Sequence, residues 1–391
     1  MASTFGSLQV GKVTMGVGAV SQVGEEARRL AEGSGKPSAL VVCGRVIGSS
    51  ELLGRVTALL ESAGLAAHVF AEVEPEPSLD AVDKCAAVIE EGEFGVVIGL
   101  GGGSSLDVAK VAAAIAGRGY ARDHVGVGKI PGKGLPTLMV PTTSGSGSEV
   151  TPSALLSDPE GGGLKRGVVS PFMVPDASIV DAELTLTLPP GSTAASGMDV
   201  LVHALEAYVS LRANPVTDAL ALRSMALVGM SLRKAFANGE DLAAREQMAS
   251  ASLLAGICIG NAGLGLVHAI ALPLGGRFGI AHGIANAVLL PYVLEFNLPS
   301  NLSKYAASSE ALGENVDGLT LRERARLVIR AVRDLIEDLD IPPSLKDLGI
   351  PDSALDTLAQ DAMDNKRLLA TNPRKPTLDQ VRTICQRAWN G

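Results

Sequence analysis

The stretch Val96-Val-Ile-Gly-Leu-Gly-Gly-Gly-Ser-Ser-Leu-Asp-Val-Ala-Lys110 passes from an apolar β-rich run, through three successive glycines, into a helical segment. Glycine permits backbone conformations that other residues avoid, and it allows a ligand to approach the backbone closely. Ser104 can cap the helix that follows, whose free N–H groups attract a phosphate. This order favours a dinucleotide pyrophosphate site over a purely structural turn. The stretch lacks the Gly-Lys-Ser/Thr of a P-loop, which disfavours an NTPase.

Short β-rich runs alternate with helical segments around this loop, up to about residue 185. Such alternation predicts a mostly parallel sheet with helices on both faces. The predicted strands are residues 38–43, 68–70, 95–99, 136–141 and 167–170, and the predicted helices are 50–62, 79–91 and 105–116.

The second half of the sequence consists of long segments rich in Ala and Leu with helical periodicity. We therefore expect an α/β, Rossmann-like, dinucleotide-binding domain over residues 1–187 and an all-helical domain over residues 188–391. Helices are predicted at residues 193–211, 215–237, 241–256 and 321–339.

A second polar loop, residues 141–152, concentrates hydroxyl groups and glycines directly after a predicted strand. Its hydroxyls and amides could hold ribose, amide or phosphate oxygens, although a flexible surface turn is the alternative. We expect this loop to emerge from the same sheet edge as the glycine-rich loop.

Asp199 and His203 lie four residues apart in GMDVLVHALEAY, and His268 and His282 follow in a second apolar region. A spacing of four places the carboxylate and the imidazole on one helix face. One oxygen and three nitrogens, with no thiolate, suit Fe²⁺, Zn²⁺, Co²⁺ or Ni²⁺ better than Ca²⁺ or Mg²⁺. Each histidine taken alone is better explained as an ordinary core or surface residue.

The composition limits the partners that the protein can have. A net charge of −9, with Lys and Arg scattered along the chain, argues against nucleic acid. The sequence contains no signal peptide pattern and no uncharged apolar run of membrane-spanning length, so we expect neither secretion nor membrane insertion. The cysteines show no paired spacing, which predicts a reducing, cytoplasmic environment: Cys43, Cys85, Cys258 and Cys385.

Five motifs together resemble the iron-containing (group III) alcohol dehydrogenase family, in order and over nearly the whole chain: GLGGGSSLDVAK, PTTSGSGSEVT, GMDVLVHALEAYVS, GLVHAIALPLGGRFGIAHGIANAVLLPYVLEFN and TNPRKPT. The resemblance implies a dehydroquinate synthase-like fold with the active site in a cleft between the two domains. It also implies hydride transfer between NAD(P) and a small alcohol or aldehyde, a divalent metal, Fe²⁺ or alternatively Zn²⁺, and a homodimer or larger assembly.

The same resemblance assigns residues to roles, with no catalytic residue distinct from the metal ligands. The ligands would be Asp199, His203, His268 and His282. The pyrophosphate would contact Gly102, Gly103 and Ser104, and the rest of the cofactor would contact Thr142, Thr143, Thr151, Ser153, Asp107, Lys165 and Leu184.

Two positions depart from the family pattern. Many relatives have a second histidine four residues after the third ligand, whereas this chain has Leu272, so we expect the proton to leave through water or a ribose hydroxyl. NAD-preferring relatives place an aspartate after the first strand of the domain to bind the ribose 2′-OH. This chain has Gly44 followed by Arg45, which predicts that NADP(H) is tolerated or preferred.

Other functions on the same scaffold remain open, including a polyol dehydrogenase, a maleylacetate reductase and a dehydroquinate synthase-like lyase. The lyase needs several basic residues near the metal, but the segments around the ligands contain only Arg277. A nonenzymatic metal- or nucleotide-binding protein is a more remote alternative.

Overall fold

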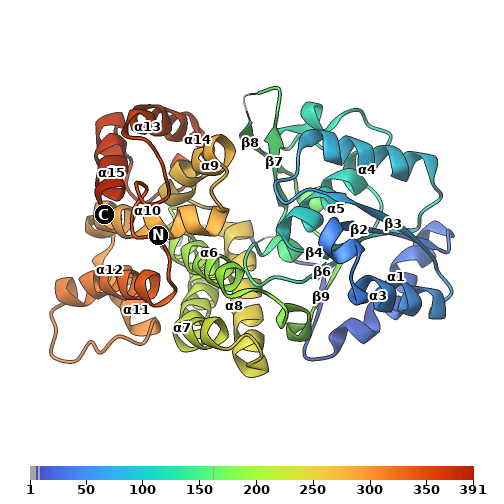
Figure 1. Cartoon of the computed structure of the whole chain (residues 1–391), viewed down its shortest axis with the longest axis horizontal. Coiled ribbons are helices and arrows are strands. Elements are labelled where there is room, and N and C mark those ends of the chain that lie inside the picture. Colours follow the sequence, from blue (N-terminus) through green and yellow to red (C-terminus); the bar gives the residue numbers. More distant parts are fainter. Residues whose placement is uncertain (1–5, 8, 162) are drawn as a thin grey trace. The chain divides into compact units, whose positions relative to one another are not determined.

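The computed structural model describes residues 6–7, 9–161 and 163–391. The chain divides into two compact units, Leu8–Thr185 and Leu186–Gly391, the second of which also includes Gly6 and Ser7. The first unit is built on a parallel sheet and the second is helical, as Figure 1 shows. The predicted fold class is therefore confirmed.

The first unit contains a six-stranded sheet in which every adjacent pair is parallel. After the second strand in the sequence (Ser38–Gly44), the chain forms the edge strand Ala66–Val73 on one side of it. The chain then returns, and the next strand, Val96–Gly101, pairs with the other side of Ser38–Gly44. This reversal creates a topological switch point, where ligands of open α/β sheets bind. The strand order is β1 (Lys12–Met15), β9 (Ala177–Val180), β6 (Thr137–Pro141), β4 (Val96–Gly101), β2 (Ser38–Gly44) and β3 (Ala66–Val73).

Helices cover both faces of this sheet (Figure 1). Successive side chains of a strand point to opposite faces. Leu40 accordingly packs in one apolar cluster, with residues of α4 (Leu79–Glu91) and α5 (Gly103–Ile115). Its neighbour Val41 packs in the other, with residues of α1 (Val23–Ala31) and α3 (Glu51–Ser62).

A second, three-stranded sheet departs from the sequence-based expectation. The strand predicted at 167–170 is part of β8 (Leu164–Val169), which pairs antiparallel with β7 (Ser153–Asp158) and parallel with β5 (Gly126–Val127). The connection between β7 and β8 is too short for the crossover that parallel strands need. A hairpin therefore forms instead of a further strand of the main sheet.

Local sequence signals explain where several helices of the second unit begin. Asn214 accepts hydrogen bonds from the backbone N–H groups of Val216 and Thr217, and Pro215 fills the first helical position. Thr320 and Glu323 form a reciprocal capping box. The helices are α6 (Pro190–Val209), α7 (Pro215–Ala237), α8 (Leu242–Ala262), α9 (Leu266–Phe278), α10 (His282–Asn297), α11 (Leu302–Ala311), α12 (Leu321–Asp338), α13 (Leu355–Asp364), α14 (Lys366–Leu369) and α15 (Leu378–Asn390).

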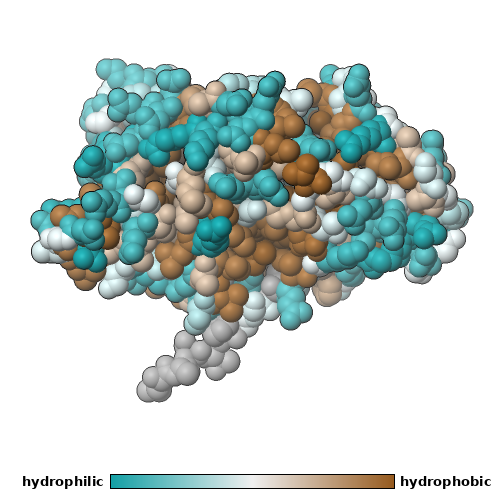
Figure 2. All heavy atoms as spheres, turned by 90° about the horizontal axis from the view of Figure 1, so that it is seen from below, coloured by the Kyte–Doolittle hydropathy of each residue, from teal (hydrophilic) through white to brown (hydrophobic). Residues whose placement is uncertain are grey.

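Hydrophilic residues cover much of the face drawn in Figure 2, with apolar areas between them. Such a mixture is ordinary, because apolar atoms supply much of any protein surface. Among the helices in the described ranges, none is individually long and apolar enough to cross a membrane. Only α8 and α9 taken together, bent by 106°, meet that length and composition test.

Helices α6 and α10 approach each other closely at Gly283. A Cβ atom there would lie 1.9 Å from the carbonyl oxygen of Ala195, which belongs to the backbone of α6 and cannot turn aside. The absence of a side chain at Gly283 thus allows α10 to begin against α6. His282, the first residue of α10, is thereby brought to the helix that contains Asp199.

We predict that Gly283→Ala lowers the free energy of unfolding by about 1–3 kcal/mol, because overpacking forces the two helices apart. Gly191→Ala is a matched control in α6, since a Cβ atom at Gly191 meets nothing within 4 Å. Thermal unfolding of both variants measures the difference. Equal melting temperatures for the two variants would contradict the close approach.

Candidate functional site

The candidate metal centre begins on α6. Asp199 and His203 lie one turn apart on this helix, and both are buried. His203 Nε2 is 3.5 Å from Asp199 Oδ1, so the two side chains meet on one helix face, as their spacing predicts. Burial would by itself raise the pKa of Asp199, but electrostatic interactions with the imidazoles of His203, His282 and His268 and a hydrogen bond from Asn286 hold this pKa below its ordinary value.

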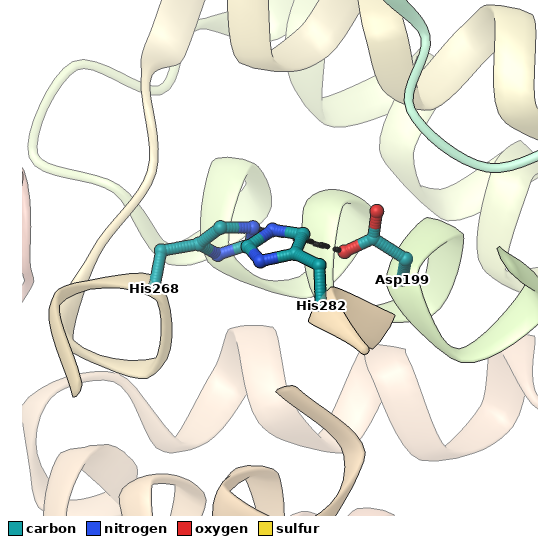
Figure 3. A group of neighbouring side chains, drawn as sticks. All are labelled: Asp199, His268 and His282. Atoms are coloured by element: carbon teal, nitrogen blue, oxygen red, sulfur yellow. Dashed lines mark ion pairs between the residues drawn. The ribbon is translucent and has the colours of Figure 1, made fainter. Parts of the chain in front are cut away.

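Two more imidazoles reach the same carboxylate from α9 and α10 (Figure 3). The Nε2 atoms of His268 and His282 each lie 3.8 Å from Asp199 Oδ1. One ligand atom from each of Asp199, His268 and His282 falls within 4.8 Å of the others. In a tetrahedral shell with bonds near 2.1 Å, ligand atoms are about 3.4 Å apart, so these donors fit a divalent cation after a small contraction.

His203 lies beside this group of three. Its ring stacks on that of His268, with ring centroids 5.0 Å apart and an interplanar angle of 18°. With its Nε2 already close to Asp199 Oδ1, His203 is placed to supply a fourth donor. The four residues predicted from the sequence thus contact one another within the second unit.

Glu206 is a further residue of this site, which the sequence analysis missed. Its carboxylate accepts hydrogen bonds from the backbone N–H groups of Gly265 and Val267, at 2.8 and 2.7 Å, and so caps the start of α9. The oxygen bonded to Gly265 also accepts from His268 Nδ1, at 2.7 Å. A proton held on Nδ1 leaves a lone pair on Nε2, the atom that faces Asp199.

Asn286, also missed, lies four residues after His282 on α10 and donates to Asp199 Oδ1. A spacing signal was available for both missed residues, because Glu206 is seven residues after Asp199 and helical spacings of four and seven share one face. Leu272 occupies the position four after His268 on α9 and is buried. It cannot take part in proton transfer.

In the first unit, the glycine-rich loop and the second polar loop lie against each other. Cβ atoms at Gly102 and Gly103 would lie 3.3 Å from Thr143 Cγ2 and 2.8 Å from Ser146 Cβ. The N–H of Thr142 donates to the carbonyl oxygen of Gly101, at 2.9 Å. The shared sheet edge expected from the sequence is therefore observed, beside the switch point between β2 and β4.

Ser104 does not cap α5, contrary to the sequence-based expectation. The N-cap residue is Gly102, and no side chain caps the helix. The Ser104 hydroxyl lies in the first turn and donates to the carbonyl oxygen of Pro75, at 2.6 Å. The start of α5 thus has no side-chain competitor for a bound anion, which suits a pyrophosphate.

A charged pair on α5 fixes the second loop. Asp107 accepts hydrogen bonds from the Ser148 hydroxyl and from the N–H of Leu155, at 2.5 and 2.8 Å. Lys110 is fully buried and donates to the carbonyl oxygens of Ser148 and Ser153, at 2.9 and 2.6 Å. Its burial lowers its pKa, which the neighbouring carboxylates of Asp107 and Glu149 oppose.

The remaining predicted cofactor contacts lie at other points of this unit. Thr151 is near Lys110, at 3.3 Å from its Nζ. Lys165 lies on β8 and forms an ion pair with Glu76. Leu184 packs beside the apolar cluster of α1 and α3. Gly44 ends β2, and Arg45, which follows it, is exposed.

Two protein-family models match the chain, one in each unit. The model described as "Iron-containing alcohol dehydrogenase" matches residues 11–182, and "Fe-containing alcohol dehydrogenase family, C-terminal" matches residues 193–389. The chain is 42% identical over 381 residues to long-chain-alcohol dehydrogenase 1 of Geobacillus thermodenitrificans, covering 96% of this chain and 95% of that protein.

Solved structures show the same likeness. A crystal structure of 1,3-propanediol oxidoreductase has a TM-score of 0.94 at 36% identity, covering 99% of this chain and 100% of the other. Sulfoacetaldehyde reductase from Bifidobacterium kashiwanohense, in complex with NAD⁺, has a TM-score of 0.88 at 29% identity, covering 99% of both chains.

We predict that Glu206→Gln raises the dissociation constant for a divalent cation by about 10–100-fold, the usual effect of losing a carboxylate that orients a ligand histidine. Metal competition with a chelator measures this change. Glu295→Gln is a matched control, because Glu295 forms surface ion pairs with Arg333 and Arg387. If the two variants bind metal equally well, Glu206 does not orient His268 for this purpose.

Proposed function

Because the chain belongs to the iron-containing alcohol dehydrogenase family and is an oxidoreductase of CH–OH groups, we propose that it interconverts a small alcohol and its aldehyde or ketone with NAD(P). The convergence of three imidazoles on Asp199 Oδ1 is the observation that supports this proposal most. Family membership implies a divalent metal and NAD(P) as cofactors.

We propose that Asp199, His203, His268 and His282 hold the metal, with Fe²⁺ the expected ion and Zn²⁺ the alternative. When bound, a divalent cation supplies a Lewis acid that stabilises negative charge on the substrate oxygen. Glu206 keeps the His268 lone pair directed toward Asp199.

The cofactor is assigned to the two loops of the α/β unit. Gly102, Gly103 and Ser104, at the uncapped start of α5, would bind the pyrophosphate. Asp107 and Lys110 fix the second loop in place against α5. The remaining contacts would come from Thr142, Thr143, Thr151, Ser153, Lys165 and Leu184.

We propose a neutral substrate without phosphate or sulfonate groups. Arg277 is the one basic residue in the segments flanking the ligands, residues 198–208 and 264–279. Its guanidinium is already paired with Asp361, through contacts of 2.6 and 3.1 Å. An anionic substrate group would have to compete with that carboxylate, which disfavours the lyase alternative.

Several predictions from the sequence stay predictions. The buried Leu272 leaves water or a ribose hydroxyl to take the proton. A homodimer or larger assembly, a cytoplasmic location and a site lying in a cleft between the domains likewise follow only from the sequence and the family resemblance.

Asp199→Ala is expected to abolish metal binding and to lower kcat/KM on the order of 10³-fold, because Lewis-acid stabilisation is worth several kcal/mol. Elemental analysis and nicotinamide absorbance, with a panel of alcohols and both nucleotides, measure the two effects. Asp356→Ala, which removes an exposed carboxylate paired with Arg382, is the control. Full activity in metal-free protein would contradict the proposal, and inactivity of the metal-loaded wild type over the panel would favour a binding protein.

Gly44→Asp is expected to lower kcat/KM for NADPH by about tenfold relative to NADH, because charges about 4 Å apart repel by 1 kcal/mol or more. A Cβ atom at Gly44 would lie 3.1 Å from the carbonyl oxygen of Val73, so Gly44→Ala controls for the steric change. Steady-state kinetics with both nucleotides measures the ratio. A strong preference of the wild type for NADH would refute the predicted acceptance of NADP(H).

A further inference from the structure

The side-chain amide of Asn286 meets three of the proposed ligand atoms at once. Asn286 is fully buried on α10, one turn after His282. Its Nδ2 lies 2.7 Å from Asp199 Oδ1 and 3.2 Å from the Nε2 atoms of both His268 and His282. A single nitrogen therefore faces the point toward which the carboxylate and two imidazoles converge.

The carboxylate decides which way this amide is turned. An ionised carboxylate can only accept hydrogen bonds, so the amide must present N–H to it, and the opposite orientation would place two oxygens in contact. In the part of the chain that the structure describes, Asn286 Oδ1 is buried without a hydrogen-bond partner. An unpaired buried oxygen is unfavourable, so the contacts of Nδ2 must outweigh this cost.

Two of the atoms that Asn286 meets have lone pairs to offer, Asp199 Oδ1 and His268 Nε2. The proton of His268 is on Nδ1, toward Glu206, so its Nε2 is an acceptor. The two N–H groups of one amide thus face these two acceptors, which would otherwise repel each other, and His282 Nε2 lies as close as His268 Nε2, at 3.2 Å. The partial positive charge of this amide acts on the same atoms that a cation would bind.

We propose that Asn286 is a positioning residue of the metal centre. Its N–H groups hold Asp199, His268 and His282 together before the cation binds, and the bond to Asp199 Oδ1 persists afterwards. This inference rests on the proposed function, because it takes these atoms as the metal ligands. Outer-shell hydrogen bonds of this kind change metal affinity by about 10–100-fold.

The test is the Zn²⁺ affinity of Asn286→Leu, measured on metal-depleted full-length protein by competition with a chromophoric chelator. Leucine keeps the branching and the number of heavy atoms of the side chain and removes both donors, so we expect the Zn²⁺ dissociation constant to rise by about 10–100-fold. Asn297→Leu is the matched control, since Asn297 is a buried amide of the same helix that bonds Asn372. Asn297→Leu should leave the Zn²⁺ dissociation constant within about twofold of the wild-type value, because Asn297 touches none of the proposed ligands. If Asn286→Leu binds Zn²⁺ with the same dissociation constant as the wild type, the inference is overturned.

Asn286→Asp provides a second measurement in case the leucine variant does not fold. It keeps the size of the side chain but turns an oxygen toward Asp199 Oδ1, so the melting temperature of the metal-free protein should fall and Zn²⁺ should raise it more than in the wild type. An unchanged metal-free melting temperature would overturn the inference. Failure of the wild type to bind Zn²⁺ would instead refute the proposed metal site, so the two failures are distinguishable.

Discussion

Three imidazoles approach a single carboxylate oxygen inside the helical unit, and the positions of helices α6, α9 and α10 are coupled to that meeting. Buried acceptors crowded together are unfavourable unless donors or a cation satisfy them. Glu206 contributes twice, because the same carboxylate caps α9 and fixes the tautomer of His268. The start of α10 reaches α6 only because Gly283 has no side chain. The packing of α6, α9 and α10 therefore determines where the proposed ligands lie.

The α/β unit has a different requirement, because its loops must expose backbone N–H groups to a ligand while staying ordered. Its glycine-rich loop packs against the second loop, where a side chain at Gly103 would collide with Ser146 and one at Gly102 would crowd Thr143. Asp107 and Lys110 then fix the second loop to α5 through buried hydrogen bonds. Rigid loops around an uncapped helix start give an anion a preformed site, which reduces the entropy lost on binding.

Local patterns in the sequence predicted strands β2, β3, β4 and β6, helices α3 to α8 and α12, and the pairing of Asp199 with His203, because periodicity and spacing determine these features directly. Strands β1 and β9 were not predicted, since each has only four residues and shows too short a pattern. The hairpin of β7 and β8 was not foreseen, since a short polar connection resembles any other loop. Glu206 and Asn286 were missed because their roles depend on partners about 60 and 87 residues away. The prediction that Ser104 caps α5 was wrong, because its hydroxyl donates a hydrogen bond to the carbonyl oxygen of Pro75. These two residues come together only in the folded chain.

The central claim is that one divalent cation binds where Asp199, His268 and His282 converge. Anomalous diffraction from crystals grown with Zn²⁺, recorded on both sides of the zinc absorption edge, tests it most directly. The account predicts one strong anomalous peak at about 2.0–2.2 Å from Asp199 Oδ1 and from the Nε2 atoms of both histidines. An anomalous zinc peak elsewhere in the protein, with none between Asp199, His268 and His282, would contradict this claim.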